Sequence, residues 1–109
     1  MSFNVFTIPP FEKQLRRLVK KYPSLKEEYL QLTLGLMANP KQGTSIGNNC
    51  YKIRLQIASK GKGKSGGARI ITNIVVADEK VYLLSIYDKS EQAGISDKEL
   101  KALLKFIQL

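Results

Sequence analysis

Six residues have the side chains that RNA cleavage requires, because they combine cations with one phenol and one carboxylate. They are Lys52, Arg54, Arg69, Tyr87, Asp88 and Lys89. When RNA is cut by its own 2′-hydroxyl, that proton is removed, the charge on the phosphate is stabilised, and the departing 5′-oxygen is protonated. Lysine and arginine stabilise the charge directly, and a lysine crowded by other cations can transfer a proton. These residue types therefore indicate chemistry on a phosphodiester.

An antiparallel sheet would have to bring these residues together. Lys52 and Arg54 lie on the polar side of a strand predicted at residues 51–57, where apolar and polar side chains alternate. Arg69 lies near the start of the next predicted strand, at residues 68–76. In an antiparallel meander these positions can converge, but the direction in which Arg69 faces depends on a strand register that the sequence leaves open.

The third predicted strand, residues 81–87, ends at Tyr87 and is followed by Asp88 and Lys89. Tyr87 could stack on or orient a base, and Asp88 could act as a weak general base. The structural alternative is that Tyr87 is an ordinary strand residue and that Asp88 and Lys89 form an exposed turn.

A basic, glycine-rich segment at residues 59–67 separates the first two of these strands. Its composition predicts a mobile loop, in which Lys60, Lys62 and Lys64 would contact RNA. Gly63-Lys64-Ser65 resembles part of a nucleotide-binding P-loop, but the glycine that the pattern requires at position 58 is replaced by Ala58, and a strand follows instead of a helix. The segment therefore does not predict nucleotide hydrolysis.

The composition favours a polyanionic partner. Eighteen Lys and Arg against nine Asp and Glu give a net charge of +9 and an isoelectric point near 9.8. Alternatively, the charge only keeps the protein soluble.

The chain has no histidine and one cysteine, Cys50, so we expect no internal disulfide, no metal site and no cofactor, and a reducing cytoplasm fits. We also expect no membrane contact, since the chain has neither a signal-peptide pattern nor eighteen consecutive apolar residues.

The N-terminal part of the chain predicts a strand and two helices. Residues 3–8 predict a short strand that Pro9-Pro10 ends, and a helix can begin there and continue to Pro23. One side of this helix is apolar, and the opposite side is basic. The basic side carries Lys13, Arg16, Arg17, Lys20 and Lys21. It is either a solvated surface or a binding surface for phosphate or an acidic partner.

Two sequences of the capping-box form mark further helices. Ser24-Leu25-Lys26-Glu27 predicts the start of a second helix that ends near Asn39-Pro40, and Ser96-Asp97-Lys98-Glu99 predicts a C-terminal helix. We therefore expect one α+β domain over residues 1–109. In it, an N-terminal strand and an α-helical hairpin pack on an antiparallel sheet of about four strands, with a C-terminal helix.

This order of elements resembles the RelE/ParE toxin superfamily, most closely its RelE/HigB-like branch. The most specific matches are residues 49–55 (NCYKIRL), residues 60–72 (KGKGKSGGARIIT) and residues 86–91 (IYDKSE). The resemblance implies a RelE-like fold and a bacterial toxin of a type II toxin–antitoxin system. Such a toxin is a ribosome-dependent, metal-independent endoribonuclease that cleaves messenger RNA in the A site and inhibits translation.

The resemblance also implies site residues and partners. By position, Lys52 and Arg54 match the basic pair on the family's second strand, Arg69 matches the arginine on its third, and Lys89 falls near the basic residue after the last strand. The implied partners are the ribosome with its messenger RNA and a cognate antitoxin, an acidic or amphipathic protein that folds onto the toxin and masks its basic surface.

The chain departs from the family near its C-terminus. Where the family often has a catalytic tyrosine or a His-Tyr pair, this chain has Gly94-Ile95. Tyr87 or Asp88 then takes over that role, or cleavage is slow, or only binding remains. Two other functions stay open: a ParE-like inhibitor that binds DNA gyrase, and a non-catalytic RNA-binding domain.

Overall fold

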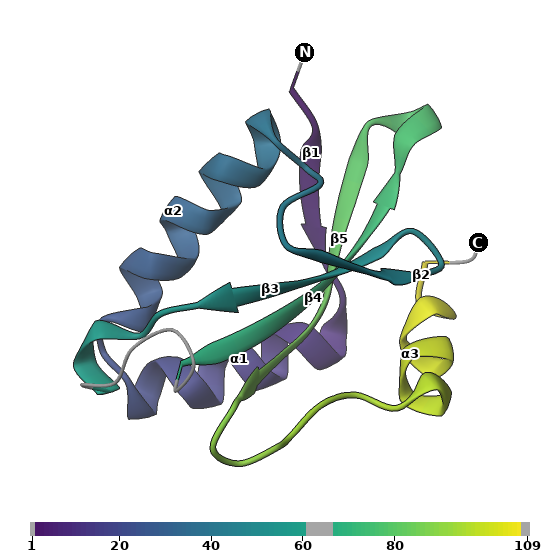
Figure 1. Cartoon of the computed structure of the whole chain (residues 1–109). Helices are drawn as coiled ribbons and strands as arrows, with labels where there is room; N and C mark the ends of the chain where they lie inside the picture. The colour runs from purple at the N-terminus through teal and green to yellow at the C-terminus, as the bar shows by residue number, and fades with distance from the viewer. Residues whose placement is uncertain (1, 61–66, 108–109) are drawn as a thin grey trace.

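The computed structural model describes residues 2–60 and 67–107 of the chain (Figure 1). In chain order, the elements are β1 (Asn4–Thr7), α1 (Pro9–Lys21), α2 (Leu25–Ala38), β2 (Thr44–Gly47), β3 (Cys50–Leu55), the 3-10 turn η1 (Ala58–Lys60), β4 (Ala68–Val75), the 3-10 turn η3 (Val76–Asp78), β5 (Lys80–Asp88) and α3 (Asp97–Leu104). None of the helices in these ranges combines the length and the apolar character that a membrane span needs.

The strands form one five-stranded mixed sheet in the order β1-β5-β4-β3-β2. The meander of β3, β4 and β5 is antiparallel, as the sequence predicts, whereas β1 pairs with β5 in parallel. The α+β fold class and the C-terminal helix are confirmed. The expectation of about four antiparallel strands missed β2, because its four residues lie in a polar, glycine-containing stretch that shows no alternation.

The helices divide between the two faces of the sheet, as Figure 1 shows by the separation of α3 from α1 and α2. Alternation along β3 assigns the faces. Ile53 lines a groove with Leu32 of α2, whereas its neighbour Lys52 lines a pocket with Leu100 of α3. The first face therefore belongs to the helical hairpin, and the second face lies beside α3.

The main core lies between the sheet and the helical hairpin. Phe11 and Leu18 of α1 and Leu25 and Leu36 of α2 are completely buried. Cys50, which lies on the other face of the sheet with Lys52, is also completely buried, and burial raises the pKa of its thiol.

The two predicted capping boxes have different outcomes. At α3, the Ser96 hydroxyl accepts from the Glu99 amide at 3.1 Å and the reciprocal bond is also present, so this box is confirmed. At α2, the helix begins where the sequence predicts, but the capping box itself is absent: Ser24 has helical backbone angles and makes no capping bond. A capping side chain reaches back only from an extended backbone, and the Ser24 hydroxyl instead donates to Glu28 at 3.1 Å.

Candidate active site

Three of the predicted site residues form a row across the meander. The register sets Arg54 of β3 directly opposite Arg69 of β4, and Arg69 directly opposite Tyr87 of β5. Residues paired in this way point to the same face, with Cβ atoms about 5 Å apart. The sequence left the direction of Arg69 open, and the register fixes it.

Lys52 lies on the same face, because it precedes Arg54 by two residues on a regular stretch of β3. It also lines a pocket together with Tyr87. We call the surface formed by Lys52, Arg54, Arg69 and Tyr87 the basic face. It is the face on the α3 side of the sheet.

The cations of the basic face differ in exposure. Arg54 is exposed and Lys52 is half-buried, whereas Arg69 is 4% exposed and donates to the carbonyl oxygen of Ala68 at 3.2 Å. Like charges directly opposite each other on neighbouring strands destabilise a sheet. An anion held near Arg54 and Arg69 would relieve that repulsion, so the pair suits binding of a phosphate.

Tyr87 is also buried, with 4% of its surface exposed. Burial raises the pKa of its hydroxyl, which is moved further up by Glu99 and down by the charge of Arg69. The hydroxyl is therefore protonated at neutral pH. Among the described residues it has no hydrogen-bond partner, which is uncommon for a buried polar group.

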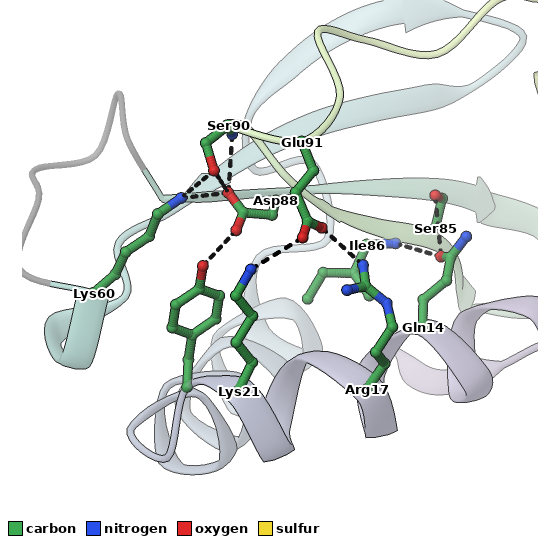
Figure 2. Close-up of polar contacts among 10 residues, drawn as sticks. Gln14, Arg17, Lys21, Lys60, Ser85, Ile86, Asp88, Ser90 and Glu91 are labelled. Carbon is green, nitrogen blue, oxygen red and sulfur yellow. Dashed lines mark hydrogen bonds and ion pairs between the residues drawn. The ribbon is translucent and has the colours of Figure 1, made fainter.

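Asp88 lies on the opposite face from Tyr87, because adjacent residues of a strand point in opposite directions. Figure 2 shows its carboxylate at the centre of a polar cluster. It accepts from the Tyr22 hydroxyl at 2.6 Å, from the Ser90 amide at 2.9 Å and from the Ser90 hydroxyl at 2.7 Å, and it forms an ion pair with Lys60. Asp88 is thus apart from the cations of the basic face.

The environment of Asp88 stabilises its charged form. Complete burial by itself would raise the pKa of this carboxyl, but the hydrogen bonds from Lys60, Tyr22 and Ser90 outweigh it. The net result is a pKa well below the ordinary range for aspartate. A carboxylate with such a pKa accepts a proton weakly, which is unfavourable for the general-base role considered from the sequence.

The remaining predicted residues lie beyond the ends of the strands. The Lys60 side chain is 8% exposed and its ammonium group donates to Asp88 and, at 3.1 Å, to Ser90. Lys89 donates from its side chain to the Ala93 carbonyl at 3.1 Å. Lys62 and Lys64 belong to residues 61–66 of the predicted mobile loop, which lie outside the described residues, so RNA contact by all three lysines stays a prediction.

The sequence did not indicate the residues that hold the end of β5 in place. Glu91 binds Arg17 at 2.9 Å and Lys21 at 3.1 Å, which connects this segment to α1 (Figure 2). Two cations of the basic side of α1 therefore form ion pairs within the protein. Tyr22, which follows α1, was not among the predicted site residues, and its hydrogen bond to Asp88 depends on a shift in the β4–β5 register that the sequence does not show.

The described residues contain no group of three or more His, Cys, Asp or Glu side chains that could hold a metal ion. Arginine and lysine bind a phosphate and neutralise added charge, and a protonated tyrosine donates a hydrogen bond.

The comparisons with known proteins agree on one family. A family model described as the RelE toxin of the RelE/RelB toxin–antitoxin system matches residues 10–108. The fold is similar to an E. coli RelE double arginine mutant in the free state, with a TM-score of 0.65, 17% identity, and coverage of 96% of this chain and 97% of that one. It is also similar to a chain of the intact E. coli RelBE toxin–antitoxin complex, with a TM-score of 0.61, 17% identity, and coverage of 80% and 96%.

Proposed function

Because this chain belongs to the RelE toxin family, we propose that it is a ribosome-dependent endoribonuclease that cleaves messenger RNA in the A site and so inhibits translation. The observation that carries this proposal is the convergence of Lys52, Arg54, Arg69 and Tyr87 on one face of the sheet. A toxin that only bound a protein surface would have no particular need for opposed arginines beside a lysine and a buried tyrosine.

Each residue of the basic face has a role in this reaction. Arg54 and Arg69 bind the scissile phosphate and stabilise the charge that its oxygens gain as the 2′-oxygen attacks phosphorus and its proton passes to water. Lys52, which lies beside this row on the same face, donates a proton to the departing 5′-oxygen. Tyr87 donates a hydrogen bond to the RNA. Asp88 has no part in the chemistry, since its carboxylate faces the helical hairpin and is a weak base.

The ribosome supplies what the basic face lacks. Cations bind a phosphate well, but they do not by themselves align the 2′-hydroxyl, the phosphorus and the leaving oxygen. A codon held in the A site is already constrained by ribosomal RNA. We therefore expect free RNA to be cut far more slowly than RNA on a ribosome.

Mapping of messenger 5′ ends after induced expression tests the proposal. New ends should appear within translated codons, and Arg54→Ala and Arg69→Ala should each lower cleavage by about a hundredfold or more. Lys20→Ala, which removes the same charge from the exposed side of α1, should leave cleavage nearly unchanged. Arg54 is exposed, so its truncation is compatible with folding.

Three outcomes would contradict the proposal in different ways. Equal cleavage in all three variants would remove the basic face from the reaction. Growth arrest with uncut messengers would eliminate the ribonuclease, and arrest accompanied by damaged DNA would favour the ParE-like alternative. RNA binding without arrest or cleavage would favour the non-catalytic domain.

We also propose that a cognate antitoxin docks on the helical hairpin. A groove of about 450 Å³ between α1 and α2 is lined by the apolar residues Leu15, Val19 and Leu30, by Tyr29 and by three cations. The cations are Arg16, Lys20 and Lys26. This combination suits an amphipathic segment whose apolar residues enter the groove and whose flanks are acidic. One solved structure similar to this chain is an E. coli RelE mutant in complex with an antitoxin peptide.

Neutralisation assays test this docking surface. Leu30 is 45% exposed, and Leu30→Glu should abolish rescue by the antitoxin while toxicity remains. Val76→Glu is a matched control, because Val76 is 60% exposed in the turn between β4 and β5 and does not line the groove. Rescue of Leu30→Glu as complete as that of Val76→Glu would show that the antitoxin binds elsewhere.

A further inference from the structure

A small pocket of about 170 Å³ opens beside the basic face, between the sheet and α3. Its apolar walls come from Ile46 of β2, Ile95 and Leu100. Proteins that recognise single-stranded RNA hold individual unstacked bases against apolar or aromatic side chains. A pocket of this size and lining suits one planar base, with its sugar and phosphate left outside.

Gly94 also lines this pocket. A Cβ atom added at Gly94 would meet no other atom within 4 Å, and the backbone there is not in the left-handed region. A larger residue at this position would therefore be tolerated by the fold and would change the lining of the pocket. The glycine is thus a place where the pocket can be altered without strain.

The polar groups of the pocket include two residues of the basic face. Lys52 and Tyr87 both line it, so a base bound there would leave its phosphate close to Arg54 and Arg69. The Tyr87 hydroxyl is buried and has no partner among the described residues. A ligand group that reached this hydroxyl would complete its hydrogen bonding.

Asp97 provides the third polar group. It is exposed at the start of α3 and lines the same pocket. A carboxylate accepts hydrogen bonds, whereas a lysine donates them. The pocket therefore presents an acceptor and donors around a space of one base.

We propose that this pocket binds a guanine of the RNA substrate and so selects the sequence at which this toxin cuts. Guanine presents two adjacent donors, its ring N–H and its amino group, that fit the Asp97 carboxylate. Its O6 and N7 accept from a cation such as Lys52, a pairing that recurs in nucleic-acid recognition. The inference rests on the proposed ribonuclease function, because it assigns specificity to the same site.

Gly94→Val tests the pocket against a matched control, Ala93→Val, which adds the same side chain at an exposed neighbour that does not line it. Mapped cleavage sites of the unaltered toxin should be enriched in guanine at one fixed position relative to the cut. In Gly94→Val, cleavage at these sites should fall about tenfold relative to other sites. Asp97→Asn should reduce the same preference, and Ala93→Val should leave the distribution unchanged.

Several results would overturn the inference. The mapped sites could lack any base preference, or Gly94→Val could leave their distribution as it was. A uniform fall at every site would mean that the added side chain only disturbs Lys52 or Tyr87. Any of these results would leave the ribonuclease proposal intact, since cleavage itself would still be observed.

A direct binding measurement separates failure of the pocket from failure of the enzyme. Guanosine 5′-monophosphate and uridine 5′-monophosphate are titrated into the isolated protein while NMR follows the amide signals of residues 94–97. Selective shifts with the guanine nucleotide, lost in Gly94→Val, would support the pocket even if no messenger were cut. Equal responses to both nucleotides, or none, would refute it.

Discussion

Replacing Asp88 with asparagine tests whether the buried polar cluster at the end of β5 stabilises the fold. The substitution keeps the size of the side chain and removes its negative charge. Asparagine can still accept a hydrogen bond from Tyr22 or Ser90, but it cannot form the ion pair with Lys60. The Lys60 side chain, 8% exposed, would then be a cation without its present counterion.

The structure gives the expected size of this effect. Removing one partner of a buried ion pair costs about 3–5 kcal/mol, and we expect about 3 kcal/mol here because Lys60 lies near the surface and can turn toward water. For a domain of this size, each kcal/mol lowers the melting temperature by roughly 4 °C or more. Asp88→Asn should therefore melt at least about 12 °C below the unaltered protein.

The pH dependence of this difference follows from the lowered pKa of Asp88. A carboxyl whose pKa is lower in the folded state stabilises the fold fully above its unfolded pKa, about 4, and loses that contribution as the pH falls toward the folded value. The stability gap between the two proteins should thus be about 1 kcal/mol smaller at pH 3 than at pH 7. Urea unfolding followed by circular dichroism at the two pH values measures it.

Glu91→Gln is the matched control, because it removes the same charge three residues later. The Glu91 side chain is 37% exposed and pairs with Arg17 and Lys21, which are themselves exposed. Exposed pairs of this kind contribute little, so the midpoint should hardly move. Equal losses in the two variants, or an Asp88→Asn gap that is the same at pH 3 and pH 7, would refute the reasoning.

Three further substitutions test parts of the fold. Ser96→Ala removes the cap that accepts from Glu99 and should cost about 1 kcal/mol in urea unfolding. Gly43→Ala should cost more than about 1 kcal/mol by the same measurement and lower cleavage, because Gly43 has a φ of +93° and its added Cβ would lie 2.3 Å from the Lys52 carbonyl oxygen. Leu36→Ala should cost about 2–5 kcal/mol in thermal unfolding, since Leu36 is completely buried in α2.

The local pattern of the sequence was sufficient to predict most of the helices and strands. Alternation of Lys52, Ile53 and Arg54 predicted both the strand β3 and its basic side, because side chains of a strand point alternately to its two faces. The prolines at positions 9, 10 and 23 likewise marked the ends of β1 and α1. Such signals act within a few residues and need no knowledge of the remaining chain.

Pairing between distant strands could not be predicted in this way. The parallel contact of β1 with β5 joins Asn4 to Lys80, and it places β1 at an edge of the sheet. The short strand β2 is held by its pairing with β3 rather than by its own residues. Both depend on contacts between segments that carry no local signal of one another.

The candidate site depends on the register between β4 and β5, which decides the face to which each side chain points. The β4–β5 register shifts between Ile71 and Thr72, whose partners are Ser85 and Leu83, so Leu84 is an extra residue in β5. In an uninterrupted strand, Leu83, Ser85 and Tyr87 would all share one face.

The extra residue Leu84 reverses the facing of everything that follows it in β5, as β-bulges near active sites often do. Leu83 remains in the core, Tyr87 turns to Arg69, and Asp88 turns to Tyr22. Without the bulge, Asp88 would lie beside Arg69 and Tyr87 would enter the core. A prediction that assumes a regular strand therefore cannot tell which of these two residues belongs to the basic face, and the buried orphan hydroxyl of Tyr87 follows from the same single insertion.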